Sequence, residues 1–155
     1  MIPIIISIPG APVGKERPRV NPHTRQAWTP TKTREWEERA RYYMREAMRE
    51  YNLDPLSQAV RVKVVAGFEA PKVAQCSVRL PRLGKPDADN IVKAVLDAGN
   101  KIVWCDDEQC AVSIEPVWVA RGESARVVLC VEARTELPSW VHELLDVTAE
   151  SEVEA

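Results

Sequence analysis

Acidic side chains gather in two short groups on either side of one predicted helix, residues 89–100. Asp87 and Asp89 stand where this helix begins, and a second group, residues 106–108, follows after the chain has turned. Carboxylates held within a few ångströms repel one another, so such a cluster usually requires a cation. Hard oxygen ligands without nearby His or Cys favour Mg²⁺ or Mn²⁺ over zinc. Because Mg²⁺ is commonly shared with phosphate oxygens, this pattern indicates phosphate chemistry.

The same acidic residues also fit purely structural roles. Asp89 can cap the helix, and Asp87 can interact favourably with its positive N-terminal end. Lys93 lies four residues after Asp89 and four before Asp97, which is the spacing of a simple ion pair on a helix surface. Residues 106–108 can form a solvated turn. Spacing alone therefore leaves both a metal site and these structural roles open.

The surrounding pattern predicts one α+β domain. A strand over residues 1–8 is followed by a long loop, and Thr29 and Pro30 mark the start of an amphipathic helix that ends near Asn52. Strands are predicted over residues 60–68, 74–80, 110–119 and 124–134, and a short helix over 138–146. Pro116 indicates an edge position or a bulge. We expect a mixed or antiparallel β-sheet packed with two main helices and a short C-terminal helix.

Basic side chains flank the acidic groups in the sequence. The long loop and the following helix start carry most of them, and others directly precede Asp87. Cations beside a phosphate site favour contacts to a nucleic-acid backbone. The candidate DNA-binding residues are Lys15, Arg17, Arg19, Lys32, Arg34, Arg82 and Lys85. Trp28, in the same loop, either stacks on a base or belongs to the core.

The distribution of charge explains why an acidic chain can bind DNA. The 155 residues have a net charge of −2, but residues 135–155 hold six acidic side chains and no Lys or Arg. Residues 1–134 therefore carry a net charge of +4. We expect a domain over residues 1–146 and a disordered acidic tail over 147–155, which limits non-specific duplex binding.

Composition excludes several other classes of protein. No apolar run approaches the ~20 residues of a membrane helix, and the N-terminus lacks the basic start of a signal peptide, so we expect a cytoplasmic protein. The four cysteines form no CxxC pair and there are two histidines, which argues against zinc. We expect the cysteines to be reduced, buried thiols in strands.

The central segment resembles a known family. The pattern P-D-x-D-N-x-x-K-x-x-x-D (residues 86–97), followed by W-x-D-D-x-Q (residues 104–109), is similar to the RusA family of Holliday junction resolvases. The basic segment 12–19 and the pattern T-P-x-x-T-R-x-W (residues 29–36) also resemble RusA-type proteins of bacteria and phages. The resemblance covers about residues 4–119 and implies a RusA-like fold.

This resemblance implies a particular activity and site. Asp87, Asp89 and Asp107 would be the catalytic and metal-binding residues, and Lys93 would be a catalytic lysine. The family is Mg²⁺-dependent, with Mn²⁺ a substitute, needs no organic cofactor or membrane, and acts on branched DNA. It is homodimeric and nicks opposing strands symmetrically, and hydrolysis would leave a 5′-phosphate and a 3′-hydroxyl. The alternatives are a flap nuclease on the same scaffold and a catalytically silent junction-binding protein.

Overall fold

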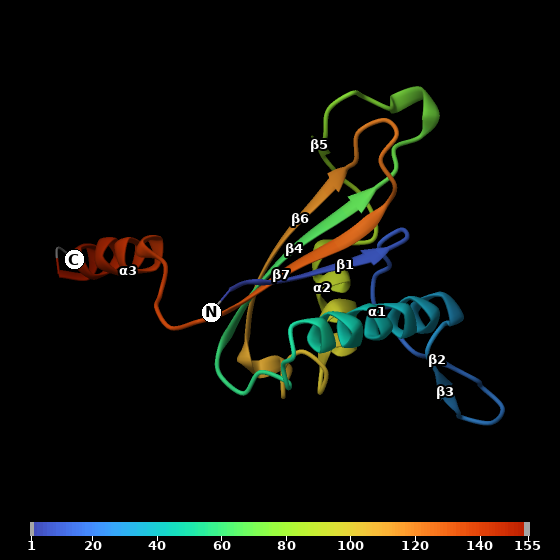
Figure 1. Ribbon diagram of the computed structural model, residues 1–155, viewed down its shortest axis with the longest axis horizontal. Coiled ribbons are helices and arrows are strands. Elements are labelled where there is room, and N and C mark those ends of the chain that lie inside the picture. Colours follow the sequence, from blue (N-terminus) through green and yellow to red (C-terminus); the bar gives the residue numbers. More distant parts are fainter. Residues whose placement is uncertain (1, 154–155) are drawn as a thin grey trace.

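The computed structural model describes residues 2–153, with side chains through residue 147. Twelve elements follow one another along the described chain (Figure 1). In order they are β1 (Ile4–Pro9), β2 (Arg19–Val20), β3 (Ala27–Trp28), α1 (Thr31–Glu50), β4 (Val60–Phe68), η1 (Lys72–Ala74), β5 (Leu80–Pro81), α2 (Ala88–Gly99), η2 (Asp107–Gln109), β6 (Cys110–Trp118), β7 (Arg126–Ala133) and α3 (Ser139–Val153).

The main sheet has five strands in the order β1-β7-β4-β6-β5. Strands β4 and β6 run parallel, and the other neighbouring pairs are antiparallel. The parallel pair requires a long crossover, and this crossover contains β5 and α2. The prediction of an α+β domain with a mixed sheet and two main helices is confirmed. Pro116 pairs with Ala66 of β4, and on its other side the short β5 reaches only the end of β6.

One apolar core joins the sheet to the helices. Alternate residues of β1, β4 and β7 are buried, as period-two patterning predicts, while α1 packs against β1 and α2 against β6. The apolar stripe of α1 belongs to this core, with Trp36, Ala40 and Met44 almost fully buried. Burial of these side chains, which is favourable by ~25 cal/mol per Å² of apolar surface, therefore orients both helices on the sheet.

Several local predictions were wrong. Helix α1 has Pro30, not Thr29, at its N-terminal boundary, and no side chain caps it. Most of the segment 74–80 is not a strand: only Leu80–Pro81 pair with β6, because the preceding residues are held to the turn at residues 120–123 instead. None of the four cysteines is buried, although Cys110 and Cys130 do lie in strands.

The C-terminal helix is longer than predicted. Helix α3 extends to Val153 and so includes much of the segment that we expected to be a disordered tail. The segment has no proline or glycine to end a helix. The disordered tail over residues 147–155, of which 154–155 lie outside the described residues, stays a prediction. Figure 1 shows α3 at the end of an extended segment. Trp140, near its start, is exposed and lines a groove with Arg61 and Lys63 of β4. The boundary of the catalytic domain near residue 146 stays a prediction.

The helices of the structure were compared with the requirements for crossing a membrane. Among the described residues, no helix combines the length and the hydropathy needed to cross a bilayer.

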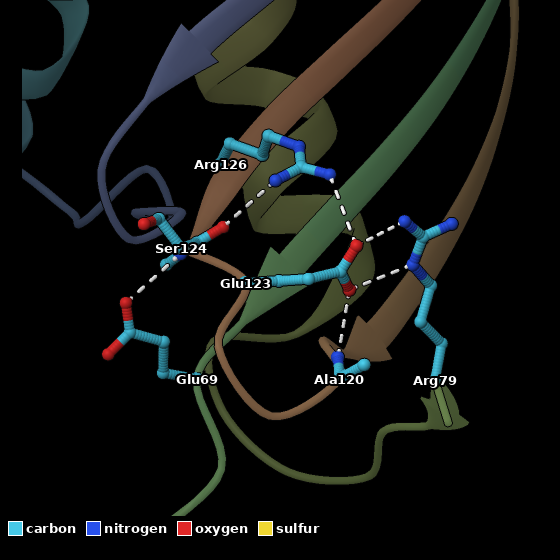
Figure 2. Close-up of polar contacts among 7 residues, drawn as sticks. Glu69, Arg79, Ala120, Glu123, Ser124 and Arg126 are labelled. Atoms are coloured by element: carbon cyan, nitrogen blue, oxygen red, sulfur yellow. Dashed lines mark hydrogen bonds and ion pairs between the residues drawn. The ribbon is translucent and has the colours of Figure 1, made fainter. Parts of the chain in front are cut away.

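A charged clamp fixes the end of the sheet from which the crossover departs (Figure 2). The carboxylate of Glu123 accepts hydrogen bonds from the Arg79 guanidinium and, at 2.9 Å, from the Ala120 amide, and Arg126 lies 3.6 Å away. The backbone amide of Arg121 also donates to the carbonyl of Cys76 at 2.7 Å. These contacts attach the chain before β5 to the β6–β7 turn, and thereby hold the segment that leads to α2.

The clamp has a measurable acid–base signature. Hydrogen bonding to Arg79, with a smaller contribution from the Ala120 amide, lowers the pKa of Glu123 from 4.5 to about 2. Because the pKa of Glu123 is lower in the folded state, the clamp's contribution to the free energy of unfolding is complete above pH 4.5. It is lost as the pH falls through about 2. We predict an NMR titration midpoint near 2 for this carboxyl group, moving toward 4.5 in Arg79→Gln. A midpoint near 4.5 in the unsubstituted protein would contradict the clamp.

Candidate active site

Asp87 and Asp89 lie together at the N-terminal end of α2. Asp87 is the N-cap residue, with extended backbone, and its carbonyl accepts the amides of Asn90 and Ile91 at 3.1 and 3.2 Å. The Asp87 carboxylate makes no capping hydrogen bond, and both aspartates are exposed. The alternative in which Asp89 caps the helix is therefore wrong. Both carboxylates are accessible to a ligand at the positive end of the helix.

Lys93 lies one turn along α2 from these carboxylates. Its ammonium nitrogen is 3.2 Å from Asp89 Oδ2, and both side chains are mostly exposed. Such an exposed pair stabilises a protein little. The spacing prediction of an i,i+4 pair is correct, and the same geometry places a cation directly beside the acidic pair.

The loop between β1 and β2, residues 10–18, packs against this end of α2. The Lys15 amide donates to the Asn90 carbonyl at 2.8 Å, and the Thr33 hydroxyl donates to the Gly14 carbonyl at 3.4 Å. A Cβ at Gly14 would lie 2.8 Å from Cβ of Pro86. Only glycine permits this close approach of the loop to the start of α2.

Lys15 joins three elements through its ammonium group. The nitrogen lies 2.6 Å from Glu37 of α1 and 2.8 Å from Asp97 of α2, and Glu37, which also pairs with Arg41 at 3.4 Å, is almost buried. Burial acts to lower the pKa of Lys15, but the hydrogen bonds to Asp97 and Glu37 outweigh it and leave that pKa raised. Asp97 is exposed, and its ion-pair partner is Lys15, whereas Lys93 pairs with Asp89. Lys15, expected at the DNA, is already bound to two carboxylates.

Two open grooves meet at the acidic pair. One, of about 360 Å³, runs along Asp87 and is bordered by the cations Lys32 and Lys85. The other, of about 680 Å³, runs along Asp89 and is bordered by Arg17 and Lys93. Lys15, Glu16 and Asn90 line both grooves. The structure thus brings four predicted site cations next to Asp87 and Asp89, although the outermost of these cations, Arg17 and Lys93, are 76 residues apart in the sequence.

Arg82, which we predicted to bind DNA, contacts aromatic rings and backbone in this structure. Its guanidinium carbon lies 3.7 Å above the Phe68 ring centroid and 4.9 Å from that of Trp118. The same group donates to the carbonyls of Gly84, at 3.1 Å, and Lys85. Burial lowers the pKa of Arg82. Its contacts are with aromatic rings and backbone, so it positions the segment before Asp87.

Asp107 lies at the opposite end of α2. The turn after the helix is fixed by the Val103 amide, which donates to the Gly99 carbonyl at 2.8 Å, and Lys101 lies 3.9 Å from Asp106. Asp107, the next residue, begins η2 and is exposed. A helix of 12 residues is about 18 Å long. Within the described residues, no three His, Cys, Asp or Glu side chains are grouped to hold a metal ion.

The neighbours of Asp107 fix η2 in place. Asp106 accepts the Glu108 amide at 3.4 Å, while its own amide donates to Gln109 Oε1 at 2.7 Å. The Glu108 hydrogen bond is the main cause that lowers the pKa of Asp106. Gln109 also donates to the carbonyls of Leu56 and Gln58, at 3.1 and 2.8 Å. This role of Gln109 was not predicted, although the D-x-x-Q spacing from Asp106 to Gln109 is typical of a capping box.

The other five predicted DNA-binding residues are all exposed. Arg17 and Arg19 flank the start of β2, Lys32 and Arg34 lie in the first turn of α1, and Lys85 precedes Asp87. Arg19 lies 3.8 Å from Glu16. These five side chains can reach a polyanion without breaking a buried contact.

An exposed acidic pair bordered by cations, at the start of a helix on a mixed sheet, fits an enzyme that cleaves the phosphodiester backbone of a nucleic acid. The family model of the endodeoxyribonuclease RusA matches residues 9–132, and the chain belongs to this family. It is therefore an endodeoxyribonuclease of the Holliday junction type, a class that acts on branched DNA and generally depends on divalent metal. No curated protein gives a significant match.

The attachment by Lys15 can be tested through stability. Lys15→Met leaves the nearly buried Glu37 without its closest cation, and we predict a loss of about 1–3 kcal/mol in the free energy of unfolding. Lys32→Met removes an exposed lysine from the same groove and should change stability by less than about 0.5 kcal/mol. Urea denaturation of the free protein measures both. Equal effects of the two substitutions would contradict the role of Lys15.

Proposed function

We propose that this protein is a Mg²⁺-dependent Holliday junction resolvase that nicks two opposing strands of a four-way DNA junction symmetrically. The observation that carries the proposal is the exposed pair Asp87 and Asp89, with cations on both bordering grooves. Membership of the RusA family supports a branched-DNA substrate.

The acidic residues fit a hard divalent cation. Asp87 and Asp89 offer accessible carboxylate oxygens, and the Asp87 carboxylate is not used as a helix cap. Mg²⁺ typically takes one or two carboxylates and completes its coordination with phosphate oxygens and water. Mn²⁺ accepts the same ligands and is a substitute. When bound, such an ion lowers the pKa of water and neutralises charge on the phosphate.

The other side chains have roles that follow from their positions. Lys93, paired with Asp89, places positive charge where the phosphate gains negative charge during hydrolysis. Arg17, Lys32 and Lys85 border the grooves and would hold the DNA strand by its backbone. Attack of water on phosphorus with departure of the 3′ oxygen leaves a 5′-phosphate and a 3′-hydroxyl.

We propose that the active form is a homodimer. Asp107 lies about one α2 length from Asp87 within a chain, so it does not complete that chain's own acidic pair. In a dimer with twofold symmetry, each copy can place its Asp107 against the acidic pair of the other copy. The dimer would then contain two equivalent composite sites. Two such composite sites would supply the two nicks that resolution requires.

The cellular setting follows from the family. We propose that the protein acts in the cytoplasm of a bacterial or phage-infected cell, in recombination or repair. A flap or branched-DNA nuclease on the same scaffold is the second candidate, because the exposed cations recognise DNA backbone and not sequence. Relative cleavage rates on four-way junctions, forks and flaps separate the two.

Substitution of the acidic pair tests the proposal. We predict that Asp87→Asn lowers Mg²⁺-dependent nicking of a mobile four-way junction by about 100-fold or more, because a metal-binding oxygen loses its charge. Junction binding should stay equal or become tighter, because one negative charge near the phosphate is removed. Asp54→Asn, at an exposed aspartate between α1 and β4, is the matched control and should leave nicking unchanged.

Nicking is measured on end-labelled strands with mapped cut sites, with and without Mg²⁺. Unchanged nicking in Asp87→Asn, or nicking by the unsubstituted protein after all divalent metal has been chelated, would contradict the assignment.

A further inference from the structure

Residues 19–28, which follow Pro18 of one groove and precede Lys32 of the other in the sequence, form a β-hairpin that the catalytic chemistry does not explain. Strands β2 and β3 pair with Arg19 opposite Trp28 and Val20 opposite Ala27. Asn21 closes the turn: its amide donates to Gln26 at 2.9 Å, and its side-chain oxygen accepts the amides of residues 23 and 24. Figure 1 shows this hairpin projecting from the body beside the start of α1. Its conformation is therefore set by local hydrogen bonds.

The hairpin exposes apolar side chains to no benefit for folding. Trp28 is 48% exposed and Val20 is 58% exposed, so the alternative in which Trp28 belongs to the core is wrong. Arg19 and Trp28 are directly paired, and directly paired residues of antiparallel strands share a face. One face of the hairpin thus presents an indole ring beside a guanidinium group.

The charge around Trp28 matches a nucleic acid. Residues 15–34 contain six Lys or Arg side chains and a single acidic one, Glu16. In the described part of the chain, Arg17 and Arg25 form no ion pair, so their charge is available to a ligand. An aromatic ring among unpaired cations is the combination with which proteins hold unpaired nucleotides: the ring stacks on a base and the cations hold its phosphates.

The hairpin is also attached at both ends to the acidic site. The chain that enters it, through Arg17 and Pro18, lines the groove along Asp89. The chain that leaves it reaches Lys32, which lines the groove along Asp87. A strand whose phosphate lies at the acidic pair therefore passes the base of the hairpin, and its neighbouring nucleotides lie within reach of the projecting face.

We propose that the β2–β3 hairpin recognises the branch point of the DNA, with Trp28 stacking on an unpaired base there. In continuous duplex every base is stacked on both sides and offers no face to an indole ring, whereas a branch point can. The hairpin then gives selectivity for branched over linear DNA, while the cations contribute to both. This inference rests on the proposed action on branched DNA and names the side chain that detects the branch.

Binding measurements with the full chain test this role. A four-way junction and a linear duplex of the same arm sequence are the probes, with divalent metal chelated to prevent cleavage. We expect Trp28→Ala to weaken junction binding by roughly 5- to 150-fold, the range for loss of one base–aromatic stack, and duplex binding by less than about twofold. Trp28→Phe, which keeps an aromatic face, should retain most of the junction affinity.

Two further variants serve as controls. Trp140→Ala removes another exposed indole, from α3, and should leave both affinities unchanged. Arg25→Gln, in the hairpin turn, should weaken junction and duplex binding by the same factor. Thermal unfolding of Trp28→Ala should match that of the unsubstituted protein, because the side chain is exposed.

Photocrosslinking locates the contact directly. With 5-iodouracil at the branch point, we expect crosslinks to a peptide that contains Trp28, and none from the same base in the linear duplex. If the unsubstituted protein does not prefer the junction, the proposed function fails. If it does, but Trp28→Ala keeps that preference or loses duplex binding equally, the hairpin inference fails. A lowered unfolding temperature that Trp28→Phe does not restore would also overturn it.

Discussion

The contact between the loop at residues 10–18 and the start of α2 is the constraint on which the site depends. Gly14 lies so close to Pro86 that no side chain fits between them, and the Lys15 ammonium draws Glu37 and Asp97 together. Apolar packing already joins α1 to α2 and to the sheet, and these polar contacts attach the loop to the two helices. The two grooves, their bordering cations and the root of the hairpin all lie around this junction.

A second constraint is the rigid length of α2. Asp87 and Asp89 stand at one end, held by the turn that Arg82 supports, and Asp107 stands at the other, held by Gln109. Separating the acidic residues avoids a costly cluster of negative charge in the free chain. It also gives the proposed dimer a chemical purpose, since bringing Asp107 of one copy to Asp87 of another assembles the metal ligands only where two chains meet.

Sequence patterns predicted much of the fold and the residues at the acidic end of the site. Period-two burial located β4 and β7, and the spacing from Asp87 to Lys93 located the exposed pair at the start of α2. Ion-pair partners were harder to predict from the sequence: Lys15 lies 82 residues from Asp97, and no local pattern indicates their contact. The contacts of Arg82 could not be predicted for the same reason, because its aromatic neighbours, Phe68 and Trp118, come from two different strands.

The division of the acidic residues between two chains is tested most directly by mixing two inactive variants. Copies carrying Asp87→Asn and copies carrying Asp107→Asn are unfolded together and refolded in equal amounts. If each site combines Asp87 and Asp89 of one chain with Asp107 of its partner, every mixed dimer contains one intact site. Nicking of a four-way junction should then recover to about a quarter of the unsubstituted rate. A mixture as inactive as its two components would show that each site is built within one chain.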